Sequence, residues 1–86
     1  MTTLLLVLVL GCAQPAPTAC DVICDSLVID CAFDAYPSRD SCMQGCAYKE
    51  DQGARVKGEA ACIQTAACDT FAIIECENKY GVPDEE

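Results

Sequence analysis

The sequence predicts an all-α fold, a small disulfide-stapled bundle of three to four short helices built on an α-hairpin. Nine of its 86 residues are cysteines, a proportion typical of short exported chains that depend on disulfide bonds. Two Cys-x-x-x-Cys pairs, Cys20/Cys24 and Cys42/Cys46, place their members just over one helical turn apart, on one face of a helix. We therefore expect two antiparallel helices that face each other through their cysteines, and no β-strand.

Composition and charge exclude several classes of function. The chain has 14 Asp and Glu against 5 Lys and Arg, a formal net charge of −9, and no His. Nucleic acids and anionic membrane surfaces attract basic patches, so neither is expected as a direct partner. A hydrolytic Cys or Ser would need a His base, and the sequence has neither the Cys-x-x-Cys spacing of zinc and redox sites nor a calcium-loop motif. The sequence thus predicts no enzyme activity, no cofactor and no metal.

Residues 1–11 have the features of an export signal. Leu4 to Leu10 is an unbroken apolar run that is too short to span a bilayer but matches the apolar core of a signal peptide. The four residues from Val9 to Cys12 then resemble a bacterial lipobox, in which a small residue precedes a cysteine that becomes lipidated and, after cleavage, the new N-terminus. The resemblance implies that Cys12 carries a diacylglyceryl group. We therefore expect the protein to be anchored in a membrane of a bacterial envelope, and of the inner and outer membranes we prefer the outer.

A second interpretation of this segment is ordinary signal cleavage after Ala13, which would release a secreted protein. Both interpretations take Cys12 out of the set of cysteines that can form disulfides, one by lipidation and the other by cleavage. Nine is odd, and removing Cys12 leaves eight cysteines, an even set for four disulfides. Because of the lipobox-like residues, we favour lipidation at Cys12, with residues 12–19 as the lipidated Cys and a Pro-containing tether. Its segment from Gln14 to Ala19 reaches roughly 20 Å at most when extended.

The folded domain is expected to span residues 20–82 and to begin with a helix from Cys20 to Tyr36. One face of this helix carries cysteines and aliphatic residues: Cys20, Ile23, Cys24, Leu27 and Cys31. A second apolar stripe lies on the opposite side: Val22, Ile29 and Phe33. A helix that is apolar on two sides is normally buried on two sides, so we expect it at the centre, between its hairpin partner and the C-terminal helices.

Three further helices are predicted after this one. Pro37 breaks the first helix, and Ser38 is a favourable N-cap for the second. Gly58 marks a break before an alanine-rich helix, and residues 68–70 supply a new cap for the last helix. Residues 83–86 form an acidic tail. The predicted ranges are 39–51, 59–67 and 71–80.

Helix geometry also predicts disulfide partners within the hairpin. If the chain turns near Pro37, Cys31 lies opposite Cys42, and Cys24 comes within about one turn of Cys46. A disulfide needs a Cα separation of roughly 5.5 Å, which both pairs can reach. We therefore predict the bonds Cys31–Cys42 and Cys24–Cys46.

The other four cysteines, Cys20, Cys62, Cys68 and Cys76, have three possible connectivities. Cys68 and Cys76 would lie about 12 Å apart along a continuous helix, which is too far for a disulfide unless the helix breaks. Between the two remaining arrangements we prefer Cys20–Cys76 with Cys62–Cys68.

Acidic pairs with i,i+4 spacing, Asp21/Asp25 and Asp30/Asp34, repel each other on a helix unless a cation or a basic side chain lies between them. One interpretation is a weak face for Ca²⁺ or a cationic ligand. The other is a solvated side of the helix, neutralised by basic residues between positions 39 and 57. We favour the solvated side.

The spacing of the cysteines resembles that of small cysteine-rich helical lipoproteins encoded in myxobacterial and related genomes. The resemblance rests on Cys12, the Cys20-x-x-x-Cys24 opening, Cys31, the Ser-Arg-Asp-Ser-Cys42-x-x-x-Cys46 segment, and Cys62 and Cys68 in Ala-rich surroundings. It implies no established activity. We expect a non-enzymatic, membrane-anchored envelope lipoprotein that acts as a structural or protein-binding module. The alternative is a secreted small effector or inhibitor without a lipid anchor.

Overall fold

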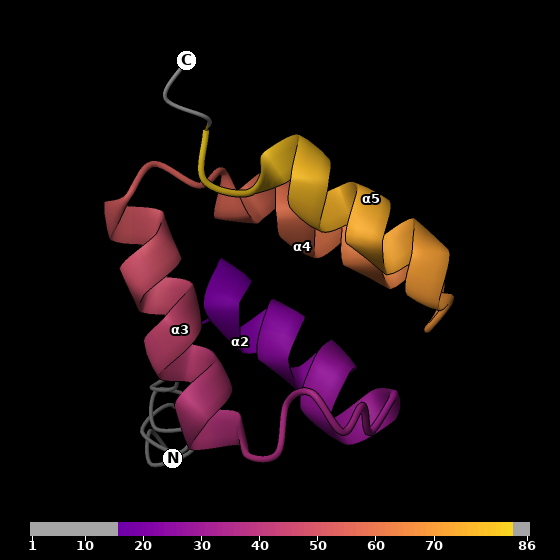
Figure 1. Ribbon diagram of the computed structural model, residues 1–86. Coiled ribbons are helices and arrows are strands. Elements are labelled where there is room, and N and C mark those ends of the chain that lie inside the picture. Colours follow the sequence, from indigo (N-terminus) through magenta and orange to yellow (C-terminus); the bar gives the residue numbers. More distant parts are fainter. Residues whose placement is uncertain (1–15, 84–86) are drawn as a thin grey trace, which may run out of the picture.

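A computed structural model describes residues 16–83 of the chain (Figure 1). This part is entirely helical and contains no strand, which confirms the predicted fold class. The first helix consists of α2, Ala19–Cys24, and a π-helical continuation, η1, Asp25–Asp30. It is followed by α3, Arg39–Asp51, α4, Val56–Ala66, and α5, Thr70–Tyr80. The predicted signal segment and Cys12 lie outside the described residues.

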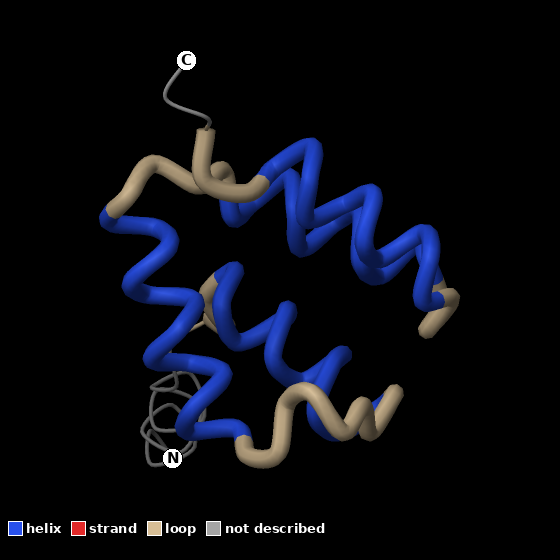
Figure 2. The backbone as a smooth tube through the Cα atoms, viewed as in Figure 1, coloured by secondary structure: helices blue, strands red, loops and turns tan. Residues whose placement is uncertain are grey.

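The helices form two antiparallel hairpins (Figures 1 and 2). In the first hairpin, α2 and η1 pack against α3, and in the second, α4 packs against α5. α2 contacts both α3 and α4, so it lies between its own partner and the second hairpin. The central position predicted for the first helix is therefore confirmed.

Side-chain caps fix where the helices begin. Ser38 Oγ accepts a hydrogen bond of 3.1 Å from the Ser41 amide at the start of α3, and Asp69 Oδ1 accepts one of 3.0 Å from the Phe71 amide at the start of α5. Both caps were predicted from the sequence. At the start of α2, Thr18 and Asp21 form a capping box that the prediction missed. Each cap satisfies backbone amides that have no partner within the helix.

The first helix ends at Asp30, earlier than the predicted Tyr36. The Cys31 amide donates to the Ser26 carbonyl at 2.8 Å, a bond to the fifth residue back that defines π-helical winding. This wider winding rotates the later residues away from the faces that an α-helical period assigns to them. As a result Ile29 is 62% exposed, while Val22 and Phe33 pack partly against the core. The predicted second buried stripe is thus wrong at Ile29.

The third helix differs at its N-terminus, since α4 begins at Val56 and continues through Gly58, where a break was predicted. Gly58 is there because of packing. A Cβ atom at this position would lie 2.4 Å from Tyr80 Cε1. The Arg55 amide also donates to the Tyr80 carbonyl at 2.8 Å, which fixes the start of α4 against the end of α5.

Cysteine side chains form a large part of the core. The buried apolar residues are Cys20, Ile23, Cys24, Leu27, Cys42, Cys46, Ala54, Val56, Ala60, Ile63, Ile73 and Cys76. A domain of this size buries too little apolar surface for more than marginal stability. Each disulfide typically adds about 2–4 kcal/mol by restricting the unfolded chain. The fold therefore depends on crosslinks that are themselves part of its interior.

Candidate functional site

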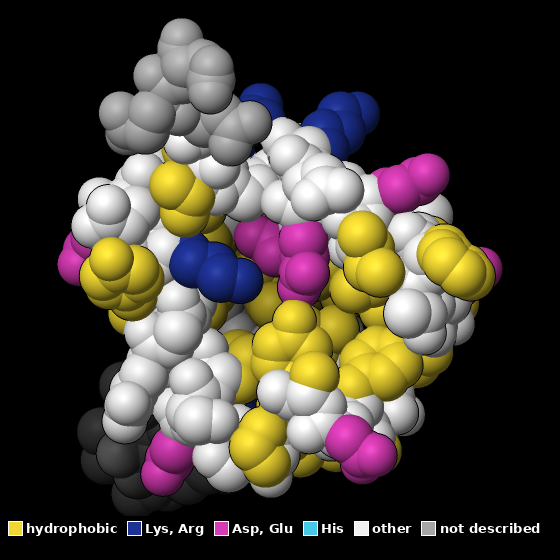
Figure 3. All heavy atoms as spheres, in the orientation of Figure 1, with side chains coloured by type: hydrophobic (Ala, Val, Ile, Leu, Met, Phe, Trp, Pro, Cys, Tyr) yellow, Lys and Arg dark blue, Asp and Glu magenta, His cyan; other side chains and the backbone are white. Residues whose placement is uncertain are grey.

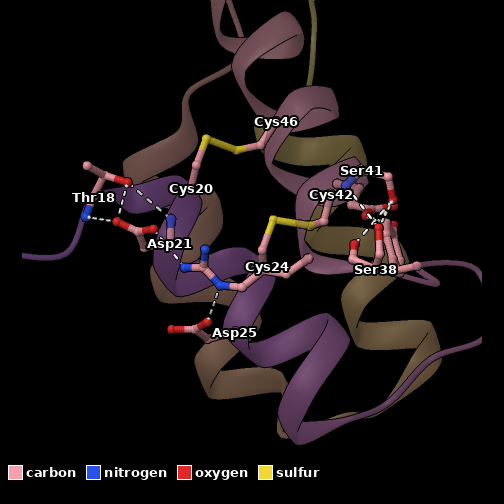
Figure 4. The surroundings of a disulfide bond; sticks show 12 residues. Thr18, Cys20, Asp21, Cys24, Asp25, Ser38, Ser41, Cys42 and Cys46 are labelled. Atoms are coloured by element: carbon pink, nitrogen blue, oxygen red, sulfur yellow. Dashed lines mark hydrogen bonds and ion pairs between the residues drawn. A yellow bond between two sulfur atoms is a disulfide. The ribbon is translucent and has the colours of Figure 1, made fainter.

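Four disulfides connect the eight cysteines of the described chain. Two join α2 to α3, namely Cys20–Cys46 and Cys24–Cys42, each with a Cα separation of 5.8 Å (Figure 4). Cys62–Cys76 joins α4 to α5, and Cys31–Cys68 links the loop after η1 to the turn between α4 and α5. Each hairpin is thus crosslinked within itself, and one bond connects the two.

The two bonds predicted for the first hairpin, Cys31–Cys42 and Cys24–Cys46, are wrong. The observed pairs centre the hairpin on Phe33, whereas the prediction centred it near Pro37. The reason is that the first helix ends at Asp30, so residues 31–37 form a loop and add no further turns to the helix. Cys24 therefore lies opposite Cys42.

The other two predicted bonds, Cys20–Cys76 and Cys62–Cys68, are also wrong. α4 and α5 run antiparallel about Asp69, the N-cap of α5, which brings Cys62 directly opposite Cys76. Cys68 lies in the turn between them, with a left-handed φ of 67°. This turn lies beside the loop that begins at Cys31, so Cys68 pairs with a cysteine that the prediction had placed inside a helix.

The first acidic pair, Asp21 of α2 and Asp25 of η1, is neutralised by a single arginine. Arg39 Nη2 lies 2.7 Å from Asp21 Oδ1, and Arg39 Nε lies 2.8 Å from Asp25 Oδ1 (Figure 4). Hydrogen bonds from Thr18 and then from Arg39 lower the pKa of Asp21 from 3.8 to about 2. The carboxylates of Asp21 and Asp25 are therefore already paired with a basic side chain of the protein.

The second acidic pair, Asp30 and Asp34, does not share a helical face, since the helix ends at Asp30. Both side chains are exposed. Within residues 16–83, no group of three or more Cys, Asp or Glu side chains is arranged to hold a metal ion.

A cavity of about 240 Å³ lies between the two hairpins. Its apolar wall includes Ile23 and Leu27 of the first helix and Val56 of α4. Figure 3 shows acidic side chains over apolar ones in the hollow between the hairpins, with a basic side chain beside them. The charged residues that line the cavity are Lys49, Glu59 and Glu77. This combination of an apolar wall with a few polar groups is typical of small-molecule sites.

Glu59 is the one buried charged residue of the described chain, with 4% of its surface exposed. No group within residues 16–83 donates a hydrogen bond to its carboxylate, whose oxygens retain access to the cavity. Burial raises the pKa of Glu59, Lys49 opposes the rise, and the negative charge of Glu77 adds to it. A carboxylate with a raised pKa in a cavity is a candidate functional group.

Glu77, by contrast, has a partner. The Tyr36 hydroxyl donates a hydrogen bond of 2.8 Å to Glu77 Oε2. Burial, followed by this hydrogen bond, raises the pKa of Tyr36 above 10. The cavity thus presents one carboxylate that is hydrogen-bonded and one, on Glu59, that is not.

This site was not predicted from the sequence, although α4 contains a signal for it. Val56, Ala60 and Ile63 follow the i, i+4, i+7 spacing of a buried helical face, and Glu59 falls on the same face. A carboxylate in the middle of an apolar stripe is the observation that could have identified Glu59. The contributions of Tyr36, Lys49 and Glu77 depend on the docking of the hairpins, which no local pattern specifies.

Comparison of the chain with protein-family models, curated proteins and solved structures finds no match. Within residues 16–83, no helix has the length and apolar character needed to cross a membrane. The four disulfides indicate an oxidising compartment outside the cytoplasm.

Proposed function

We propose that this protein is a binding module of the bacterial envelope, held at a membrane by lipid on Cys12. The observation that carries the proposal is the cysteine pairing. The four disulfides use all eight cysteines of residues 16–83, and Cys12 is the ninth cysteine of the chain. An odd cysteine in an exported protein calls for a separate role or for removal with the signal segment, and the lipobox-like residues before Cys12 favour the separate role, lipidation. The resemblance to small cysteine-rich lipoproteins favours the same role.

The module is proposed to bind rather than to catalyse. The chain has no His to serve as a general base, while its surface has features of recognition. Phe71 is 80% exposed and Ile74 is 47% exposed on α5, a degree of apolar exposure that supports contact with a protein partner. The cavity that contains Glu59 is a second feature of this kind.

Intact-mass analysis and N-terminal sequencing of the native protein test the anchor. We expect a mature chain that begins at a diacylated Cys12 and fractionates with membranes. Cys12→Ser should remove the lipid and release the protein from the membrane fraction, while the neighbouring control Gln14→Ser should leave both unchanged. An unlipidated N-terminus at Gln14 in the native protein would overturn the lipoprotein proposal and favour the secreted alternative.

A further inference from the structure

We propose that the cavity between the hairpins binds a small apolar amine, with the ligand's ammonium group on Glu59 and its hydrocarbon part against Ile23, Leu27 and Val56. This inference deepens the proposed binding function and rests on it only for the claim that the domain binds rather than catalyses. Four groups of observations carry it: the state of Glu59, the balance of charge around it, the size of the cavity, and the open space over Gly45.

The first observation is that 96% of the surface of Glu59 is buried, while its carboxylate oxygens reach the cavity and receive no hydrogen bond from residues 16–83. Removing most of the water around a carboxylate that no protein group hydrogen-bonds is costly. Its neighbours on the same face of α4, Val56, Ala60 and Ile63, are apolar, so an apolar residue would suit the packing at this position. A ligand that supplies the missing donor would offset the cost of burying Glu59.

The second observation is the charge of the cavity lining. Glu59 and Glu77 carry negative charge, and Lys49 is the one basic residue that lines the cavity within the described chain. Tyr36 already donates to Glu77, and Lys49 forms no ion pair within 4 Å among residues 16–83. The lining therefore has an excess of one negative charge and one carboxylate that needs a donor, which favours a monocation over an anion.

The third observation is size. A buried apolar cavity of about 150 Å³ is large enough to hold benzene, and this cavity measures about 240 Å³. It can therefore hold an aromatic ring that carries a short aliphatic amine. The apolar wall would bury the ring, while a primary ammonium group could donate hydrogen bonds to Glu59.

The fourth observation is the glycine in the middle of α3. A Cβ atom at Gly45 would meet nothing within 4 Å, and Gly45 lines the cavity. Gly in a helix interior is destabilising relative to Ala, and no close contact at this position requires it. Its effect is to leave the α3 side of the cavity open to a ligand.

The test measures binding of three ligands with one carbon skeleton to the full-length, disulfide-intact protein by calorimetry. The ligands are 2-phenylethylamine, neutral 2-phenylethanol and anionic phenylacetate. We expect the amine to bind most tightly. Glu59→Gln should weaken amine binding by about tenfold or more, the usual effect of losing a hydrogen bond to a charged group, and should leave alcohol binding unchanged. Glu50→Gln, which removes an exposed charge of α3 outside the cavity lining, is the matched control.

A second variant, Gly45→Leu, fills the open space and should weaken binding of the amine and the alcohol together, so the test does not depend on Glu59→Gln alone. The proposal is overturned if the amine fails to bind the wild-type protein, if phenylacetate binds more tightly than the amine, or if Glu50→Gln weakens amine binding as much as Glu59→Gln does. None of these results bears on the proposed lipid anchor, because intact-mass analysis and N-terminal sequencing test the lipidation of Cys12 independently of ligand binding.

Discussion

The Tyr36 hydroxyl lies 2.8 Å from Glu77 Oε2, and this hydrogen bond joins residues that are 41 positions apart in the chain. It connects the loop of the first hairpin to α5 of the second. Cys31–Cys68 connects the same loop to the turn before α5. The two hairpins are therefore fastened to each other by one covalent and one polar link, and both partners of the polar link line the cavity.

Tyr36→Phe removes the hydroxyl and leaves Glu77 without its donor. We expect the free energy of unfolding to fall by about 0.5–1.5 kcal/mol, the usual contribution of one hydrogen bond. Chemical denaturation of the disulfide-intact protein measures this change. Tyr48→Phe is the matched control, since Tyr48 is 66% exposed and donates no hydrogen bond among the described residues. Equal effects of the two substitutions would show that the Tyr36–Glu77 bond contributes nothing to stability.

Two helical glycines give opposite expectations for the same substitution. Gly45→Ala adds a Cβ atom in open space and improves helix propensity, so it should stabilise the protein by about 0.5–1 kcal/mol. Thermal unfolding monitored by circular dichroism measures the change. A loss of stability would mean that the space beside Gly45 is occupied in solution.

Gly58→Ala places a Cβ atom 2.4 Å from Tyr80 Cε1, which forces the ring to move. Arg55 and Lys79 both lie over this ring, at 5.2 and 5.4 Å from its centroid, and would be displaced with it. We expect a loss of about 1–3 kcal/mol, as for other overpacked sites. Measured beside Gly45→Ala, this variant separates packing from helix propensity, because propensity alone predicts the same sign for both.

The fold class and most helix boundaries could be predicted because they depend on local signals. Ser38 and Asp69 act as caps through their own neighbouring amides, so the sequence around them suffices. The four disulfides could not be predicted in the same way. Their register depends on where the first helix ends, and no break residue stands at Asp30 to mark a π-helical end six residues before the expected one.

The candidate site, like the disulfides, could be predicted from the sequence only in part. Glu59 shares a face with Val56, Ala60 and Ile63, so its burial was open to prediction from helical periodicity. Its cavity was not, because Lys49, Tyr36 and Glu77 reach it from α3, from the loop and from α5. Those contacts exist only once Cys31–Cys68 and the packing of α2 on α4 have set the two hairpins against each other.

The raised pKa of Glu59 makes stability depend on pH in a particular direction. Because the folded state binds this proton more tightly than the unfolded state, stability falls as pH rises above the usual value of 4.5. Glu59→Gln should therefore raise the free energy of unfolding at pH 7 by on the order of 1 kcal/mol, and the difference from wild type should vanish below about pH 4. Thermal unfolding across this range, without added amine, measures both. A variant that is less stable than wild type at pH 7 would contradict the inferred cost of burying Glu59.

Asp21 makes the free energy of unfolding depend on pH in the opposite direction to Glu59. Its pKa is lowered from 3.8 to about 2, so the folded state prefers the ionised form, and the stability that it contributes is lost as pH falls through this interval. Asp21→Asn should flatten the acid limb of the stability curve between about pH 4 and pH 2. Asp34→Asn, at an exposed loop position, is the control. An unchanged acid limb in Asp21→Asn would show that the contacts with Thr18 and Arg39 do not hold in solution.

Exposure of the cysteines predicts the order in which the disulfides are reduced. Cys68 is exposed and Cys31 is half-buried, whereas each of the other three bonds includes at least one buried cysteine. Thiol–disulfide exchange requires access of the attacking thiolate to sulfur. Limited reduction followed by alkylation and peptide mapping should therefore label Cys31 and Cys68 first. Earlier labelling of Cys62 and Cys76 would contradict this order.

The same bond closes the longest loop of the four, with a sequence separation of 37 against 14 for Cys62–Cys76. In the chain-entropy model a longer loop restricts the unfolded state more, so Cys31→Ser/Cys68→Ser should cost about 1 kcal/mol more than Cys62→Ser/Cys76→Ser. Denaturant titration of the two double variants measures the difference.

Because Cys31–Cys68 also holds the hairpins together around the cavity, its removal should weaken 2-phenylethylamine binding more than the loss of Cys62–Cys76 does. The reverse order in both measurements would show that the α4–α5 bond, and not the bond between hairpins, maintains the site.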